Sequence, residues 1–199
     1  MIPVARVPEP PGWPELRERG EKWLAENPDS DRLPKHWRHV IDELAEGFRH
    51  LCGYTAQYDS DGCVDHFHCV ERYRNEAYDW SNFRYASTWF NSSKGTLDLL
   101  DPHDVKEGWF KILLPSYELV LVADKVPPEF REIAAMTVKK LNLASDGRLL
   151  RIRATDHRRY LRHCEEKGEA AAMHILRQLS PLLADAVERE KMARRPRVD

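Results

Sequence analysis

The chain has 199 residues, of which 42% are hydrophobic and 32% are charged, and its formal net charge is −2 at pH 7. This length and composition are typical of a globular protein with one buried core and a well-solvated surface. The small negative charge argues against a protein that coats nucleic acid through its bulk charge, and no apolar run approaches the ~20 residues that span a bilayer.

Residues 1–50 are predicted to form an arm followed by two helices. The first residues lack the apolar stretch of a secretory signal, so we expect a cytoplasmic protein with no membrane attachment. Prolines at positions 3, 8, 10, 11 and 14 favour an extended arm. Apolar residues at helical spacing then predict one helix over residues 14–26 and another from residue 34 to about residue 51.

Residues 51–105 show a different pattern. Two short strands are expected within residues 54–67, around a turn rich in Asp and Gly. A polar loop covers residues 70–81. A helix is expected to begin near Ser81 or Asn82, either of which can cap it, and to end at Gly95, which favours helix termination. The predicted local order is therefore strand, strand, loop, helix.

Residues 106–199 are predicted to pack on this segment as a short hairpin and a set of helices. The stretches WFKILL and ELVLVAD, separated by Pro115 and Ser116, are typical of two short strands. Apolar periodicity predicts three helices, over residues 128–141, 147–164 and 168–191. We therefore expect an α+β fold, a mostly helical single domain with an additional short β-hairpin.

Asp65 and His66 end an apolar run, where a hairpin strand would normally bury its side chains. Proteins hold Mg²⁺ with one or two side-chain oxygens plus waters and phosphate oxygens, and Asp65 and Asn91 provide that number. A neutral His66 could take a proton from water and so generate a nucleophile for attack on phosphorus. Adjacent strand residues point to opposite faces, so Asp65 and His66 can serve one phosphate only if the strand ends or twists there.

Asn82 precedes Asn91 by nine residues, which corresponds to about two and a half helical turns. Two side chains with that separation cannot both reach one metal ion from the same helix. Asn82 is therefore expected before or at the helix start, where its side chain would fix the loop through backbone hydrogen bonds.

Two groups of cations suit contacts with a phosphate backbone. On the expected helix, Arg84 and Lys94 share a polar stripe with Asn91. Residues 147–163 carry six arginines against one aspartate, and the arginines selected as backbone contacts are Arg148, Arg151, Arg158 and Arg159. Phosphate contacts give affinity without reading sequence. An ordinary solvated face remains an alternative for both groups.

The motif residues resemble the HNH endonuclease superfamily, whose ββα-metal site has the same order of parts. The match is carried by the pair Asp65-His66, by Asn82 with the Trp80-Ser81 that precedes it, and by Asn91-x-x-Lys94-Gly95. The resemblance implies a metal-dependent nuclease that hydrolyses DNA.

The roles of single residues also follow from this resemblance. His66 would be the general base and Asn82 would hold the loop that completes the catalytic site. Asp65 and Asn91 would be the ligands of Mg²⁺ or Mn²⁺. Asparagine at position 91 makes the pattern H-N-N, as in the HNH domain of RNA-guided CRISPR nucleases.

Residues 45–165 are further similar to the small HNH proteins paired with an ATPase in Septu-type anti-phage systems. This similarity implies an antiviral defence role, with DNA as substrate and an ATPase subunit as partner. Such relatives often carry paired cysteines that bind a structural zinc. The four cysteines of this chain include no C-x-x-C pair, so we expect no structural zinc and aromatic packing in its place.

Two other functions remain open on sequence grounds. The chain could be a non-cleaving HNH-fold interaction subunit of a nucleic-acid-processing complex, since its arm and terminal helices suit a partner surface. It could also be a non-catalytic DNA-binding protein, whose binding would weaken steeply with salt. His68 and His103 are expected to be structural or solvent-exposed.

Overall fold

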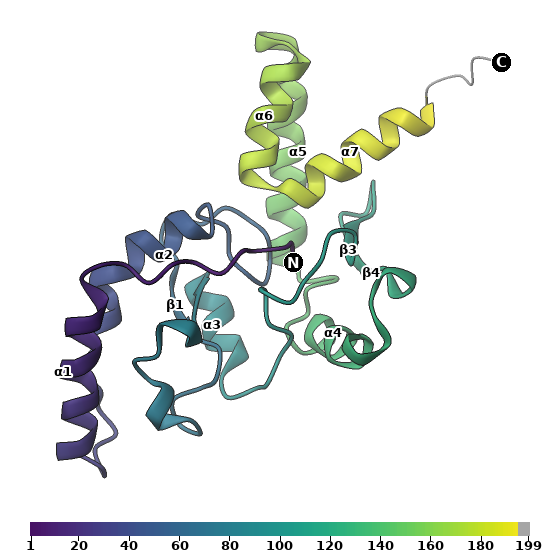
Figure 1. Cartoon of the computed structure of the whole chain (residues 1–199). Coiled ribbons are helices and arrows are strands. Elements are labelled where there is room, and N and C mark those ends of the chain that lie inside the picture. Colours follow the sequence, from purple (N-terminus) through teal and green to yellow (C-terminus); the bar gives the residue numbers. More distant parts are fainter. Residues whose placement is uncertain (195–199) are drawn as a thin grey trace.

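The N-terminal arm runs from the middle of the molecule to its edge. In the computed structural model, which describes residues 1–194, Met1 and Ile2 are buried in the interior. The arm then extends outward to α1 (Trp13–Glu26), whose second residue is a proline, as is common where a helix begins (Figure 1). A 3₁₀ helix, η1 (His36–Val40), and α2 (Ile41–Gly47) follow, so the predicted N-terminal helices are present and the second is shorter than expected.

Two small antiparallel sheets occupy the centre of the chain. Strand β1 (Cys63–His66) pairs with β2 (Phe83–Ala86), and this register places Asp65 opposite Arg84. Strand β3 (Phe110–Ile112) pairs with β4 (Leu119–Leu121). The second pair confirms the hairpin predicted around Pro115.

The first sheet differs from its prediction in the position of its strands. Residues 83–86 were expected to begin a helix, but they form β2, and the helix that follows, α3 (Thr88–Lys94), has only seven residues. Residues 52–58 contribute a single bridge, between Leu51 and Tyr58, in place of the expected first strand. The order strand, strand, helix is present, with its second strand after the polar loop.

The helical half of the chain comprises α4 (Pro128–Lys140), α5 (Gly147–Lys167), α6 (Glu169–Leu179) and α7 (Pro181–Arg194). Asp146 caps α5 by accepting hydrogen bonds from the backbone N–H groups of Arg148 and Leu149, at 2.9 and 3.0 Å. The single helix predicted over residues 168–191 is broken at Ser180, because Pro181 lacks an N–H and disfavours helical backbone in the residue before it.

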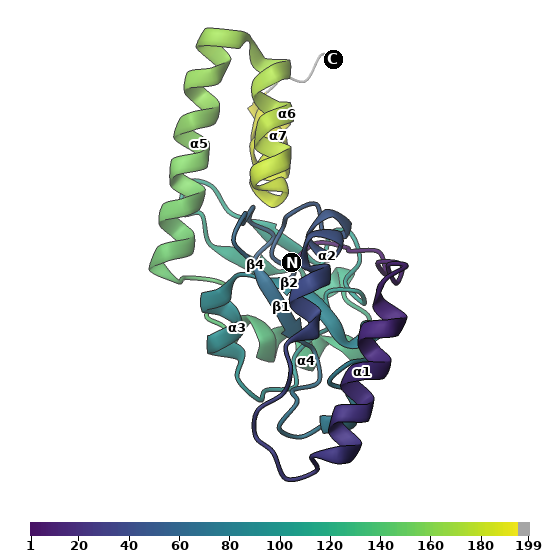
Figure 2. The same cartoon turned by 90° about the vertical axis from the view of Figure 1, so that its left-hand side faces the viewer.

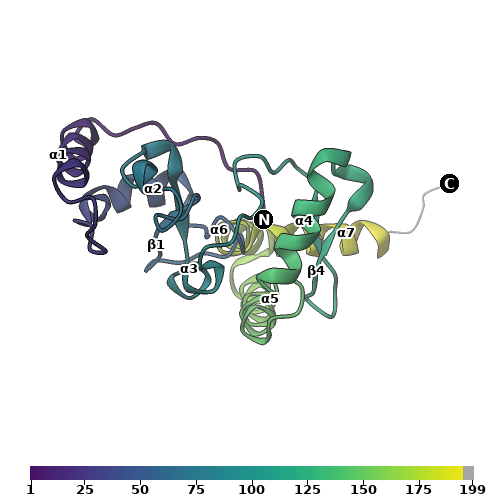
Figure 3. The ribbon, with the colours of Figure 1, turned by 90° about the horizontal axis from the view of Figure 1, so that it is seen from below.

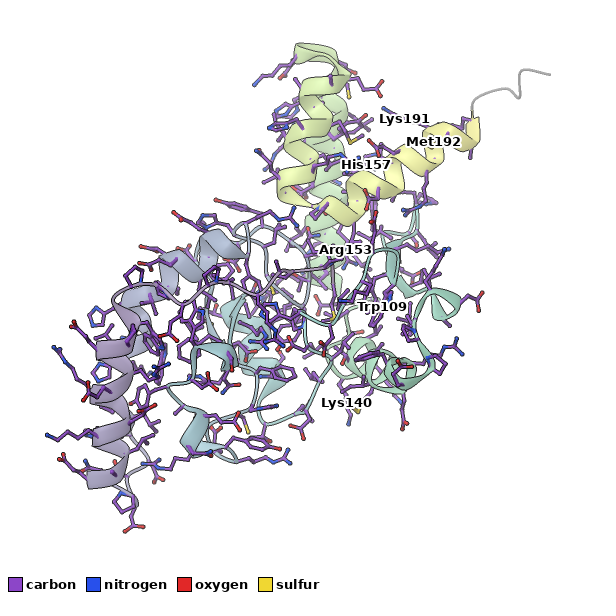
Figure 4. All side chains as sticks on the ribbon, viewed as in Figure 1. Trp109, Lys140, Arg153, His157, Lys191 and Met192 are labelled. Atoms are coloured by element: carbon purple, nitrogen blue, oxygen red, sulfur yellow. The ribbon has the colours of Figure 1, made fainter. Side chains whose placement is uncertain are left out.

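Helices α5 and α6 form a hairpin that projects from the rest of the molecule, and α7 leaves its base at a steep angle (Figures 1 and 2). Seen from below, α1 and α7 lie at opposite ends of the molecule (Figure 3). The base of the hairpin is anchored by Arg153, whose buried guanidinium donates to the Tyr117 carbonyl oxygen at 2.9 Å (Figure 4). None of the described helices combines the length and apolar character needed to cross a membrane.

Two hydrophobic cores flank the first sheet. One gathers α1, α2 and the sheet, with Trp13, Leu44, Val64 and Phe83 among its members. The other is larger and gathers α3, the second hairpin and the C-terminal helices. Together these elements make the α+β, mostly helical single domain that the sequence predicts.

Candidate active site

A pocket of about 280 Å³ opens at the end of β1. Asp65 and His66 of β1 line it together with Asn91 of α3. Because β1 and α3 are separated by the long loop and by β2, only the folded chain brings these three residues to one place. The three residues therefore border one pocket.

Asp65 is almost completely buried, with 1% of its surface exposed. Its Oδ2 accepts a hydrogen bond from the Tyr54 hydroxyl at 2.7 Å, and the Lys94 ammonium lies 2.9 and 3.1 Å from its two oxygens. Burial raises the pKa of Asp65, while the Lys94 charge and the Tyr54 hydrogen bond act in the opposite direction. The carboxylate is thus held in one orientation by two donors.

The His66 ring is oriented by its surroundings. Its Nε2 lies 2.9 Å from the Ala77 carbonyl oxygen, and its ring makes edge contacts with Trp37 and Phe83, at centroid distances of 4.6 and 5.2 Å. A carbonyl oxygen only accepts, so Nε2 carries the proton and Nδ1 keeps its lone pair. Burial lowers the pKa of His66 to about 4, so the ring is neutral at pH 7.

The sequence posed a geometric problem for adjacent strand residues, and the structure shows how it is met. The Asp65 carboxylate contacts Tyr54 and Lys94, whereas the His66 ring packs against a different set of side chains, so the two point to different faces. His66 is the last residue of β1. Both residues reach the pocket because it opens where the strand ends.

Asn91 is oriented by two weak contacts with β1. Its Nδ2 donates to the Cys63 sulfur at 3.3 Å and to the Val64 carbonyl oxygen at 3.4 Å. Within residues 1–194 its Oδ1 has no hydrogen-bond partner, so that oxygen is free to bind a ligand. Of the two predicted asparagines, only Asn91 therefore presents a free amide oxygen, because the Asn82 Oδ1 accepts a hydrogen bond from the His68 backbone N–H.

Asn82 fixes the loop that connects β1 to β2. Its Oδ1 accepts from the His68 backbone N–H at 2.7 Å, and its Nδ2 donates to the carbonyl oxygens of His68 and Glu76, at 3.0 and 3.1 Å. These three bonds close the loop from inside, which is the backbone role expected of Asn82. His68 also pairs with Glu76 through its ring, at 2.6 Å, and so has a structural role.

Two predicted backbone-binding cations are in the interior, and their assignment is corrected here. Lys94 is 1% exposed, and besides Asp65 its ammonium contacts the carbonyl oxygens of His66 and Phe67. Arg84 is 2% exposed and forms a two-pronged ion pair with Asp101. Charges that are buried and fully paired have no capacity left for a phosphate. Arg84 also lies on β2, so the expected polar stripe on one helix does not exist.

The arginines selected on α5 are on the surface. The side chains of Arg148, Arg151, Arg158 and Arg159 are all exposed. Arg148 lies over the Trp89 ring of α3, with 4.5 Å between its guanidinium carbon and the ring centroid. The beginning of α5 therefore adjoins the helix that carries Asn91 (Figure 2). Arg158 and Arg159 lie further along the projecting hairpin.

Sequence reasoning missed several residues of this site. Glu71 adds a second carboxylate to the pocket lining, and it lies in the polar loop, where no periodic pattern singles it out. Tyr54 and Ala77 orient Asp65 and His66, through a hydroxyl and a backbone carbonyl respectively. A backbone carbonyl leaves no signal in a sequence, so the Ala77 contact could not have been found without the fold.

The pocket is lined by two side chains whose oxygens are of the type that Mg²⁺ or Mn²⁺ takes, the Asp65 carboxylate and the free amide oxygen of Asn91. The Asp65 oxygens are already contacted by Tyr54 and Lys94, so a metal ion would bind there only by displacing Lys94. Across residues 1–194, no three His, Cys, Asp or Glu side chains gather into a metal-binding group. A set of one carboxylate and one amide would not form such a group.

Comparison with known proteins identifies none that is similar to this chain. No family model, curated protein or solved structure matches the chain. Function is therefore inferred from the chemistry of the site.

Proposed function

We propose that the chain is a metal-dependent endonuclease of the HNH type, which hydrolyses DNA phosphodiester bonds at the pocket beside β1. One observation carries the proposal: Asp65, His66 and Asn91, an acid, an imidazole and an amide from two separate elements, line a single pocket. The order of β1, β2 and α3 supports it, because it is the order of parts in a ββα-metal site.

His66 would act as the general base. With Nε2 donating to Ala77, Nδ1 is the acceptor that takes a proton from water, and the oxygen of that water then forms a bond to phosphorus. The bond from phosphorus to the leaving oxygen breaks, and that oxygen takes up a proton as the alcohol product. A metal ion held by Asp65 and Asn91 would polarise the phosphoryl group and stabilise the leaving oxygen.

Tyr54 and Lys94 would act as positioning residues. Both donate to the Asp65 carboxylate, and Lys94 also joins β1 to α3 through two backbone carbonyls. Arg148 would hold the DNA backbone next to α3, and the other exposed arginines of α5 would contact it further along the helix. Nothing in such contacts selects a sequence, so a partner would choose the target. An ATPase subunit of a prokaryotic anti-phage complex is the partner that we propose.

The experiment is a nicking assay on supercoiled plasmid DNA with Mg²⁺ or Mn²⁺, in which the wild-type protein should convert substrate and a chelator should stop it. His66→Ala should abolish nicking while the unfolding transition stays cooperative. His39→Ala is the matched control, because His39 is an exposed histidine outside the pocket and its loss should change nothing. Equal nicking by wild type and His66→Ala would refute the proposal.

One observation favours a second candidate, a non-cleaving interaction subunit of a nucleic-acid-processing complex. Lys94 already contacts both oxygens of the Asp65 carboxylate and partly neutralises the charge that a metal ion would need. This candidate predicts no nicking and no saturable Mn²⁺ binding, even with all partners present. Titration calorimetry with Mn²⁺ separates the two candidates, since the nuclease should bind the ion and lose that binding in Asp65→Asn.

A further inference from the structure

A second pocket lies away from the candidate active site. It measures about 730 Å³ and is bordered by the segment after α2 and by the second half of α6. None of the residues that line it also lines the Asp65 pocket. Its size falls within the range of ~300–1,000 Å³ that is typical of sites for small organic ligands.

The two walls of this pocket are joined by direct hydrogen bonds. The Tyr58 backbone N–H donates to the Leu179 carbonyl oxygen at 2.9 Å, and the Gln57 amide donates to the buried Ser180 hydroxyl at 2.8 Å. Leu51 and Tyr58 also form a β-bridge across the base of the segment. The pocket is therefore preformed, which reduces the entropic cost of binding a ligand.

Two consecutive residues of the pocket have strained backbone. Arg49 and His50 have φ of 56° and 54°, the left-handed region that favours glycine. Their N–H groups hold this conformation by donating to the carbonyl oxygens of Glu46 and Ala45, at 2.8 and 2.7 Å. Such strain concentrates at binding sites, where it serves to place particular side chains. Here it places a guanidinium and an imidazole at the pocket.

The lining of the pocket is rich in basic residues. It includes Arg49, His50, His174 and Arg177, and no carboxylate. The Arg177 charge is shared with two carboxylates of α7, at 3.2 and 2.5 Å. Arg49 is exposed and has no ion-pair partner among the described residues. Arg49 is therefore the free positive charge that an anion would meet.

An aromatic surface lies beside this charge. Tyr58 is 46% exposed, which is high for a large aromatic side chain. The His50 ring lies beside it, with centroids 5.9 Å apart and planes inclined at 39°. Exposed aromatic rings at a pocket are the usual platforms on which nucleic-acid bases stack.

We propose that this pocket binds a nucleotide, with its phosphate at Arg49 and its base against Tyr58. The structure combines the two features that a nucleotide needs, a free cation and a flat exposed ring, on a rigid support. The same chemistry is offered by a free mononucleotide and by an unpaired nucleotide at the end of a DNA strand. This site is separate from the candidate active site and does not depend on the nuclease proposal.

The test is calorimetric titration of the full chain in the presence of a chelator, so that no cleavage can occur. The ligands are AMP, adenosine, inorganic phosphate and a 5′-phosphorylated single-stranded DNA hexamer. Arg49→Gly removes the cation and accepts the left-handed backbone, so it should fold. Tyr58→Leu removes the ring. Arg38→Ala is the matched control, because Arg38 is an exposed arginine outside the pocket.

We expect AMP or the DNA hexamer to bind in a saturable manner. Arg49→Gly should weaken that binding about tenfold or more, as is usual for a lost charge-assisted contact. Tyr58→Leu should weaken it about fivefold or more, and Arg38→Ala should leave it unchanged. AMP binding identifies a free mononucleotide as the ligand, whereas binding of the hexamer alone identifies a strand end. Absence of binding by both ligands, or weakening in only one of the two pocket variants, would overturn the proposal.

Discussion

Replacing Lys94 with methionine tests the physical account of the candidate site. The Lys94 ammonium contacts both oxygens of Asp65 and the carbonyl oxygens of two further residues, in an environment where both charged side chains are almost fully buried. Methionine keeps the packing of the side-chain stem and removes the charge. Asp65 is then left as a buried carboxylate with Tyr54 as its one donor.

Removing one partner of a buried ion pair typically costs about 3–5 kcal/mol of unfolding free energy. Protonation of Asp65 limits this cost, because its pKa is already raised by burial and rises further without Lys94. An acid with a raised folded-state pKa binds more protons when folded, so stability falls as pH rises above the unfolded value of about 3.9. The loss of unfolding free energy in Lys94→Met, relative to wild type, should therefore be smaller at pH 5 than at pH 7.

Urea unfolding followed by tryptophan fluorescence measures this deficit, with the double variant Asp65→Asn/Lys94→Met as control. Because the double variant leaves no unpaired charge, its cost should be only about 1–2 kcal/mol. If Asp65 binds a metal, Mg²⁺ at ten times its dissociation constant should restore about 1.4 kcal/mol to Lys94→Met and nothing to the double variant. A Lys94→Met protein within about 1 kcal/mol of wild type would refute the reasoning.

Three further predictions concern His66, Asn82 and the arginines. The pKa of His66 is lowered to about 4, so the unfolding free energy should fall by on the order of 3 kcal/mol as the pH falls from about 6.5 to 4. In urea titrations over that range, His66→Gln should show a weaker dependence of unfolding free energy on pH. Asn82→Ala loses three backbone hydrogen bonds and should cost about 2–3 kcal/mol, with faster hydrogen exchange in the loop. Arg84→Lys should lower stability and leave unchanged the slope of log DNA affinity against log salt concentration. The double variant Arg151→Ala/Arg158→Ala should reduce that slope by about two and leave stability unchanged.

Secondary-structure elements with a clear local pattern were predictable from the sequence. Elements that depend on pairing with a distant strand were not. Helices α1, α4 and α5 and the second hairpin follow from periodicity and turn residues. In residues 83–86, Phe83 and Ala86 have helical spacing, while Phe83 and Tyr85 alternate as in a strand. Pairing with β1 decides in favour of the strand, and a distant partner cannot be seen in a local pattern.

The composition of the site was predictable in part, and its burial was not. Asp65 and His66 stand out in the sequence because they end an apolar run, and Asn91 stands out through its motif spacing to Lys94 and Gly95. The three residues line one pocket. Arg84 and Lys94 look like surface cations by composition. Their burial depends on Asp101 and Asp65, partners whose proximity arises only from the fold.

The position of the first sheet between two cores limits how the chain can be divided. Val64 and Phe83 pack toward the N-terminal helices, while Ala86 and Phe90 pack toward the C-terminal half. Each core therefore covers one side of the sheet whose strand β1 carries Asp65 and His66. Residues 51–105 therefore cannot be moved into another protein as an independent folding unit. Their removal from the chain would expose hydrophobic surface on both sides and favour aggregation.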